Sequence, residues 1–343
     1  MRNSCTLDGF TTDIVISSLE EILSEKDDRV FVTDQNVEMI LPEHEGINLL
    51  VLPAGEEFKR WESVEKIIEF ALASGLGRDS KIIGIGGGVI CDMAAFAASI
   101  YMRGISVELV PTTLLSMVDA SLGGKTGADF TKVKNIIGTF HPADRVHICT
   151  DTLFSLTEEE YKNGLAEVIK HGLLLGGKLL HMITDNREPI SKRSDKDLLE
   201  RMIFESVLVK KQFIEKDPKE RLGERAKLNL GHTFGHALET ISDLSVWSHG
   251  AAVAWGIARA MEVGVEIGET ELEYADYVKS LLKDYGFEIE YKIPRDEIDL
   301  FLKIISHDKK KRAGKVHFVL QSGVGTTFLT PLSEEIIRKV VSA

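Results

Sequence analysis

Apolar and polar positions in the first half of the chain follow the pattern of strands alternating with helices. Five short apolar runs predict buried strands, at residues 13–17, 29–33, 48–52, 80–85 and 107–110. Helical spacing or a helix-capping pattern separates them, at residues 18–21, 61–71 and 89–100. This alternation predicts a parallel sheet covered on both faces, with ligands bound at the carboxyl ends of its strands.

From about residue 157 the pattern becomes helical. Amphipathic segments predict helices at residues 157–175, 196–216, 228–241, 250–268 and 269–285, before a strand signal at 316–320. A chain of 343 residues also exceeds what one ordinary core organises. We therefore expect a Rossmann-like α/β nucleotide-binding domain at residues 1–150 and a mainly α-helical, metal- and substrate-binding domain at residues 151–343.

Composition narrows the class of partner. Hydrophobic residues make up 43% of the chain and its mean hydropathy is -0.01, values typical of a soluble globular protein. A net charge of -13 argues against nucleic-acid and anionic-membrane partners. Three scattered cysteines indicate a reducing compartment and argue against thiolate metal ligands. The sequence shows no signal-peptide core and no apolar run of roughly 18 residues, so we expect a cytoplasmic protein.

A histidine cluster is the strongest chemical signal. His232 and His236 are four residues apart in a predicted helix, so both rings project from one face. With His249 close behind and a carboxylate from elsewhere, they would form an open divalent-metal site. Thr233 stands where the zinc-protease helix carries its glutamate, so proteolysis is not supported. For the pair alone, two polar residues on a half-buried helix are an equal alternative; His249 shifts the interpretation to a metal site.

A glycine run suggests a nucleotide. A predicted strand leads directly into Gly86-Gly-Gly88 and a helix, a geometry in which backbone N–H groups can hold a pyrophosphate. Val89 occupies the third glycine position of the dinucleotide fingerprint, so the standard motif is absent and a tight turn is the alternative. A dinucleotide is favoured by polar residues at the ends of neighbouring strands, namely Asp34, Glu56, Lys59, Thr112 and Thr113.

Two further clusters carry cations. Asp119 to Lys125, followed by Lys134 and Asn135, combines glycines with positive charge suited to phosphate or carboxylate, although the segment lacks the full P-loop pattern. Glu167 and Lys170 lie three residues apart on a predicted helix. A surface ion pair there would contribute only about 0.3–0.5 kcal/mol. The apolar residues around the pair favour a buried, functional placement.

These motifs together resemble the 3-dehydroquinate synthase family of sugar phosphate cyclases. The resemblance rests on six ordered motifs: Gly86-Gly-Gly-Val-x-x-Asp92, Pro111-Thr-Thr113, Asp119-x-Ser-x-Gly-Gly-Lys125, Gly164-Leu-Ala-Glu167-x-x-Lys170, Asn229-x-Gly-His232-Thr-Phe-Gly-His236 and His249-Gly. It implies an NAD-binding α/β domain, a helical metal-binding domain, an active site in the cleft between them, and a homodimer acting in the shikimate route.

The resemblance also implies roles for individual residues. The metal, zinc with cobalt as an alternative, would be held by Glu167, His232 and His249, which frees His236 to contact the substrate near its phosphate. NAD would be held by Asp34, Asn36, Gly55, Glu56, Lys59, Gly87, Gly88, Val89, Asp92, Thr112, Thr113, Lys125, Lys134, Thr152 and Ser155. A phosphorylated carboxylate substrate would meet Asp119, Lys125, Asn135, Lys170, Lys211, Arg225, Asn229, His236, one of Lys309 and Lys310, and Arg103 of a neighbouring subunit.

The implied substrate is 3-deoxy-D-arabino-heptulosonate 7-phosphate, with transient oxidation by NAD, phosphate elimination, reduction and an intramolecular aldol closure. The chain departs from the family pattern at Leu156-Thr-Glu-Glu-Glu160, where Thr157 and Glu160 can form a helix-capping box, and its N-terminal segment looks short. Three alternatives stay open: a related cyclase such as 2-deoxy-scyllo-inosose synthase, a metal-dependent polyol dehydrogenase, and an NAD-binding regulator without activity. Lys211 and Arg225 disfavour the first, because its hexose substrate has no carboxylate.

Overall fold

The computed structural model describes residues 1–25, 27–43, 45–131, 133–242, 246–306, 311–312 and 315–342. The chain divides into two compact units, Met1–Tyr161 and Lys162–Ala343. This division falls in the first turns of a helix, whereas the sequence pattern placed a boundary near residue 150. Among the residues described, no helix combines the length and apolar character that a membrane span requires.

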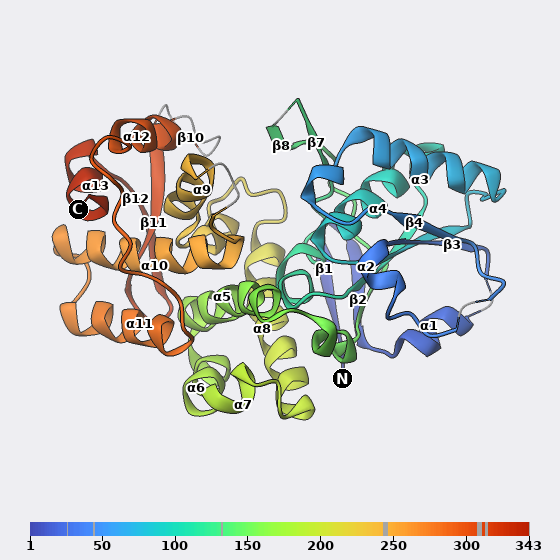
Figure 1. Ribbon diagram of the computed structural model, residues 1–343, viewed down its shortest axis with the longest axis horizontal. Helices are drawn as coiled ribbons and strands as arrows, with labels where there is room; N and C mark the ends of the chain where they lie inside the picture. Colours follow the sequence, from blue (N-terminus) through green and yellow to red (C-terminus); the bar gives the residue numbers. More distant parts are fainter. Residues whose placement is uncertain are drawn as a thin grey trace. The chain divides into compact units, whose positions relative to one another are not determined.

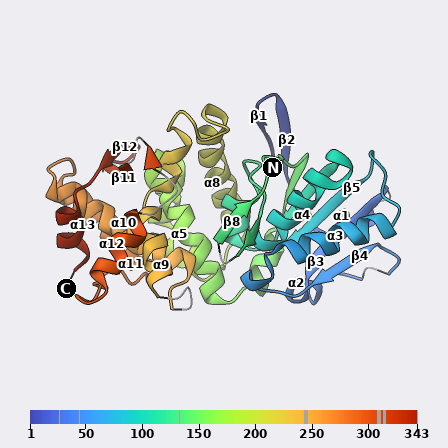
Figure 2. The ribbon, with the colours of Figure 1, turned by 90° about the horizontal axis from the view of Figure 1, so that it is seen from above.

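A seven-stranded sheet with the order β1-β2-β9-β6-β5-β3-β4 organises the first unit. Neighbouring strands are parallel except for β1, which pairs antiparallel with β2 at the sheet edge (Figure 2). The strands are β1 (Arg2–Leu7), β2 (Phe10–Ile16), β3 (Arg29–Asp34), β4 (Leu49–Leu52), β5 (Lys81–Gly86), β6 (Ser106–Pro111) and β9 (Arg145–Ile148). The predicted α/β class is confirmed, and all five predicted strands are present.

Helices cover both faces of this sheet because its strands are apolar on both sides. The helices are α1 (Leu19–Ser24), α2 (Gln35–Glu38), α3 (Trp61–Ala73) and α4 (Gly88–Ile100). One face packs Phe31, Ile83 and Val110 under α1 and α2, while α3 and α4 lie over the other (Figure 1). Gly84 allows α4 to approach, because a Cβ there would lie 2.8 Å from Cβ of Ala94.

Short elements complete the first unit and lead to the second. They are η1 (Glu56–Phe58), η2 (Tyr101–Arg103), η3 (Ser116–Ala120), η4 (Thr150–Ser155) and the hairpin of β7 (Ala128–Phe130) and β8 (Val133–Ile137). The predicted capping box at Ser18 is present, with Glu21 as its reciprocal partner. At Thr157 one half of a box is present, since the hydroxyl accepts from the backbone N–H of Glu160 at 3.2 Å.

The second unit is mainly helical, as predicted. Its helices are α5 (Glu158–Leu175), α6 (Gly177–Asp185), α7 (Arg187–Ser191), α8 (Lys196–Lys216), η5 (Arg225–Asn229), α9 (His232–Ile241), α10 (His249–Glu266), α11 (Leu272–Asp284), α12 (Ile298–Ser306) and α13 (Glu334–Val341). Its strands are β10 (Lys311–Arg312), β11 (Lys315–Gly323) and β12 (Thr326–Pro331), which form one antiparallel sheet. Buried rings of Phe234, Trp255 and Phe301 link α9, α10, α12 and β11 into a core.

Candidate functional site

Three imidazole rings gather where α9 and α10 meet. His232 is the first residue of α9, His236 follows one turn later, and His249 is the first residue of α10. The ring centroids are 5.2 Å apart for His232 and His236, and 5.5 Å apart for His232 and His249. The predicted same-face placement of the i,i+4 pair is therefore present in the structure.

Glu167 of α5 brings a carboxylate to two of these rings. Its Oε1 lies 3.6 Å from Nε2 of His232 and 3.9 Å from Nε2 of His249. The side chain is fully buried, and within the described part of the chain Oε1 has no hydrogen-bond partner. Its Oε2 accepts a hydrogen bond from Nζ of Lys170, which is also buried.

This arrangement fits a divalent cation. Carboxylate oxygen and two imidazole nitrogens converge within 4.8 Å of one another, and an orphaned buried carboxylate oxygen is costly unless a positive charge meets it. Nitrogen and oxygen donors suit zinc or cobalt, and three protein ligands leave a coordination position open for a substrate. Glu167, His232 and His249 can therefore hold a metal together.

Glycines bring the ligand-bearing helices into backbone contact. η5 ends at Asn229, and Gly231, with φ of +81°, is the N-cap from which α9 begins at His232, so the helix predicted across 228–241 is broken there. A Cβ on Gly256 of α10 would collide with the Gly231 carbonyl oxygen, and one on Gly250 would collide with the backbone of Asn163 on α5. The spacing of Glu167, His232 and His249 is thus set by contacts of backbone against backbone.

Arg225 begins η5, directly after a loop that a buried carboxylate organises. Asp217, which is 2% exposed, accepts hydrogen bonds from the backbone N–H groups of Arg221, Leu222, Gly223 and Arg225. Burial raises the pKa of Asp217, but these four donors outweigh it and hold the pKa below its usual range. Arg225 is 4% exposed and donates Nη1 to the Pro218 carbonyl at 2.6 Å. Its guanidinium is therefore held in place before any ligand arrives.

The first unit has a candidate ligand-binding edge where the order of strands along the sheet reverses. Chain connections leave β3 toward β4 and leave β5 toward β6, in opposite directions along the sheet. Asp34 ends β3 and Gly86 ends β5, so both lie at the topological switch point where open α/β sheets bind ligands. Gly87 caps the 13-residue α4, whose N-terminus favours an anion. One Asp34 oxygen already accepts from the N–H groups of Asn36 and Val37 as a helix cap.

A buried ion pair supports this edge. Nζ of Lys59 donates to Oδ2 of Asp92 at 2.6 Å, and both residues belong to the predicted NAD set. Burial lowers the pKa of Lys59, but Asp92 and Glu56 outweigh it and leave the pKa above its usual value. Thr152 donates Oγ1 to the Thr112 carbonyl at 3.1 Å, which ties η4 to the end of β6.

Comparison with known proteins decides the family. The family model described as 3-dehydroquinate synthase N-terminal matches residues 49–163, and the one described as 3-dehydroquinate synthase C-terminal matches residues 164–311. The chain belongs to the 3-dehydroquinate synthase family. The 3-dehydroquinate synthase of Geobacter metallireducens is 41% identical over 80% of this chain and 75% of its own. That of Helicobacter pylori is 39% identical over 86% of this chain and 83% of its own.

Solved structures agree with the family in fold. A 2-deoxy-scyllo-inosose synthase complexed with carbaglucose-6-phosphate, NAD+ and Co2+ matches with a TM-score of 0.87 at 24% identity, over 99% of both chains. A 2-epi-5-epi-valiolone synthase from Streptomyces hygroscopicus with NAD+ and Zn2+ bound matches with a TM-score of 0.86 at 24% identity, covering 98% of this chain and 97% of its own. At such identities the likeness establishes the fold. The predicted resemblance to the 3-dehydroquinate synthase family is confirmed.

The remaining predicted site residues differ in their contacts and in their exposure to solvent. Glu56 and Lys134 form an exposed ion pair of 3.5 Å, and Asn135, with φ of +52°, donates its N–H to Asp129 at 2.7 Å. Asn229 donates Nδ2 to Glu220 at 3.2 Å. The others in the first unit are the buried Thr112, the half-buried Asp119, Gly88, Val89 and Thr113, and the exposed Asn36, Gly55, Arg103, Lys125 and Ser155. Lys309 and Lys310 lie outside the described residues.

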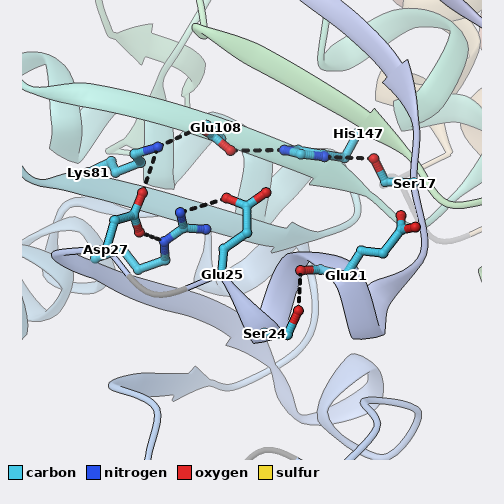
Figure 3. Close-up of polar contacts among 9 residues, drawn as sticks. Ser17, Glu21, Ser24, Glu25, Asp27, Lys81, Glu108 and His147 are labelled. Atoms are coloured by element: carbon cyan, nitrogen blue, oxygen red, sulfur yellow. Dashed lines mark hydrogen bonds and ion pairs between the residues drawn. The ribbon is translucent and has the colours of Figure 1, made fainter.

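Sequence reasoning missed a polar row in the first unit of this synthase-family chain. Ser17 hydrogen-bonds Nδ1 of His147 at 3.0 Å, His147 Nε2 bonds Glu108 at 2.9 Å, and Lys81 bonds Glu108 at 2.9 Å (Figure 3). The row continues from Lys81 to Asp27. It borders a cavity of about 300 Å³ lined by Arg2, Val15, Ser17, Glu21, Ile22, Glu25, Arg145 and His147. The signal that could have revealed this row is a polar residue within each of three apolar strands, namely Lys81 in β5, Glu108 in β6 and His147 in β9.

Proposed function

We propose that the chain converts 3-deoxy-D-arabino-heptulosonate 7-phosphate to 3-dehydroquinate and phosphate, using NAD and a divalent cation. The observation that carries the proposal is the buried Glu167 Oε1, which lacks a hydrogen-bond partner among the described residues and faces Nε2 of both His232 and His249. Membership of the 3-dehydroquinate synthase family supplies the reaction. The enzyme would be a carbon–oxygen lyase, because the bond to phosphate is broken and the NAD is regenerated.

NAD supplies transient hydride uptake and return, and the cation supplies Lewis-acid polarisation of the substrate oxygens. Support for NAD comes from Asp34 and Gly86–Gly88 at the switch point of the sheet, where the N-terminus of α4 favours a pyrophosphate. The related cyclases with NAD+ and Co2+ or Zn2+ bound support both groups. Zinc, with cobalt as an alternative, matches the nitrogen and oxygen donors.

Residues of the second unit would fix the substrate and its charges. Lys170 donates to Glu167 Oε2 and so holds the other oxygen, Oε1, toward the imidazoles. Arg225, held by Pro218 and by the Asp217 loop, would bind the substrate carboxylate with its planar two-pronged guanidinium. Lys211 on α8 would add a second cation. His236 is exposed beside the proposed ligands and would hold a proton near the leaving phosphate.

One assay separates this function from its alternatives. Purified enzyme with added metal and NAD is incubated with the heptulosonate phosphate, with glucose 6-phosphate and with a simple polyol. The proposal requires phosphate release from the first compound without net NADH, at a rate that falls at least 100-fold in His232→Ala. Exposed His181 on α6 gives the matched control, since His181→Ala should keep full activity. Phosphate release from glucose 6-phosphate alone would identify the related cyclase, and net NADH from the polyol would identify a dehydrogenase.

We also propose that the enzyme works as a cytoplasmic homodimer, as the family resemblance implies. The net charge of -13 argues against a nucleic-acid partner, and the proposed ligands are small anions. Exposed Arg103, with φ of +71° between Met102 at +49° and Gly104 at +115°, would reach the substrate phosphate of the partner subunit. Size-exclusion chromatography with light scattering should give twice the mass of 38.1 kDa. A monomer with full activity would remove this part of the proposal.

A further inference from the structure

The two nitrogens of His249 face two different carboxylates. Nε2 lies 3.9 Å from Glu167 Oε1, and Nδ1 lies 3.4 Å from Glu239 Oε1. A neutral imidazole carries its proton on one nitrogen, and only the other nitrogen can donate a lone pair to a cation. The carboxylate that accepts the proton therefore decides which nitrogen is available for a metal.

Glu239 reaches His249 from the helix that carries the other histidines. It lies seven residues after His232 and three after His236 on α9, so the three side chains share one face. The Glu239 side chain is 12% exposed and the His249 side chain is 32% exposed, so their contact is partly shielded from water.

His232 shows the same arrangement with a different acceptor. Its Nδ1 lies 3.3 Å from the Leu230 carbonyl oxygen, and its Nε2 faces Glu167 at 3.6 Å. Both imidazoles that face Glu167 thus have an oxygen beside Nδ1. Leu230 supplies a fixed backbone oxygen, whereas Glu239 supplies one that a substitution can remove.

We propose that Glu239 is a positioning residue for the metal site. By accepting the Nδ1 proton of His249, it leaves the Nε2 lone pair pointing toward Glu167, and its negative charge makes that lone pair more basic. This inference rests on the proposed metal site at Glu167, His232 and His249. It assigns Glu239 no contact with substrate or cation.

One competing arrangement uses the same residues. His236, Glu239 and His249 also bring three donor atoms within 4.8 Å, so they could hold a cation of their own through Nδ1 of His249. The two arrangements require the His249 proton on opposite nitrogens. Burial favours the orienting role, because His236 is exposed and can be satisfied by water, whereas Glu167 Oε1 is buried without a hydrogen-bond partner in the part of the chain described.

Metal titration tests the proposal directly. Metal-free wild type, Glu239→Ala, Glu239→Gln and the control Glu205→Ala are titrated with zinc and with cobalt against a chromogenic chelator. Glu205 is a comparable control, since its side chain is 22% exposed and bonds Lys178 on the same unit. Glu239→Ala should bind one metal per chain with affinity reduced about 10- to 100-fold. Glu239→Gln, which keeps an acceptor oxygen but loses the charge, should lie between, and Glu205→Ala should match wild type.

A second readout observes the proton itself. Nitrogen-15 NMR of the metal-free protein at pH 8.5 should show His249 protonated on Nδ1 in wild type, and shifted toward Nε2 in Glu239→Ala with an unchanged circular dichroism spectrum. Equal metal affinity in wild type and Glu239→Ala, or an Nε2 proton in wild type, would overturn the proposal. So would two metals per chain in wild type and one in the variant, which is the result for a separate site.

Failure of the proposed positioning role of Glu239 can be distinguished from failure of the proposed metal site. If His232→Ala loses the metal but Glu239→Ala binds it as wild type does, only the positioning role is wrong. If His232→Ala and Glu167→Gln both bind metal normally, the proposed metal site is wrong and the positioning role falls with it. Thermal midpoints of the metal-free variants should agree within a few degrees, which excludes general misfolding as the cause of lost affinity.

Discussion

Removing the Glu108 charge should weaken the first unit in a pH-dependent way. The Glu108 side chain is 4% exposed and bonds both His147 and Lys81. Burial raises its pKa, but hydrogen bonds from His147 and Lys81 outweigh burial and bring the pKa from 4.5 to about 2. At 1.36 kcal/mol for each tenfold change in proton affinity, the ionised form contributes about 3 kcal/mol at pH 7. Glu108→Gln should lower the free energy of unfolding by that order.

The sign of the pH dependence follows from the depressed pKa. The unfolded chain takes up the proton near pH 4.5 and the folded unit only near pH 2, so the contribution is complete above about pH 5 and is lost as pH falls toward 2. The difference between wild type and Glu108→Gln should therefore shrink from about 3 kcal/mol at pH 7 to about 2 kcal/mol at pH 3.5.

The cysteines make this measurement specific to the first unit. Cys5, Cys91 and Cys149 are all buried there, and the sequence has no other cysteine. Urea unfolding followed by thiol reactivity toward a dipyridyl disulfide, which reacts in acid, therefore reports on that unit alone. Glu62→Gln is the control. Glu62 on α3 is exposed and lies 3.6 Å from Arg60, so its substitution should not change the urea midpoint of unfolding. A Glu108→Gln effect below 1 kcal/mol, or one that grows as pH falls, would refute the reasoning.

Four further outcomes are expected. His236→Ala should keep its metal by elemental analysis yet lose turnover; metal loss would place this residue among the ligands. Arg225→Lys should raise KM for the carboxylate substrate at least tenfold, because lysine cannot make the two-pronged contact, and an unchanged KM would contradict this assignment. Gly256→Ala should lower the free energy of unfolding of the second unit by about 1–3 kcal/mol, since its Cβ collides with a backbone carbonyl at the start of α9; an unchanged urea midpoint would show that the helices yield freely. Mixed dimers of Arg103→Ala and His232→Ala should recover roughly a quarter of wild-type activity, and no recovery after proven subunit exchange would confine Arg103 to its own chain.

Much of the fold could be predicted from hydrophobic period alone. Apolar runs predicted the parallel strands β2, β3, β4, β5 and β6, but not the parallel strand β9, in which Arg145 and His147 interrupt the apolar residues. The antiparallel strand β1 was missed because only Cys5 and Leu7 among its residues are apolar. Asp8 and Gly9, with φ of +50° and +86°, are nevertheless the residue pair that a tight hairpin turn favours. The turn residues therefore indicated this hairpin, and the hydrophobic pattern did not.

The candidate site also contains some residues that local sequence patterns predict and others that they do not. The spacing of His232 and His236 predicts their shared face because helix geometry is local. Glu167 lies far away in the sequence and joined the set only through family resemblance. Glu239 and Asp217 could not be predicted, since each acts through a contact that exists only after folding, one with a histidine ring and the other with four backbone N–H groups.

The glycine contacts among α5, α9 and α10 also bear on how fast the proposed metal could leave. Side-chain packing can loosen by rotamer changes, but Gly231 against Gly256 and Gly250 against Asn163 meet backbone to backbone and have no rotamers to change. Release would then require whole helices to separate, an event on the time scale of local unfolding. The rate at which a chelator strips the metal should equal the hydrogen-exchange opening rate of α9, and stripping much faster than that opening would show that a ligand side chain swings out alone.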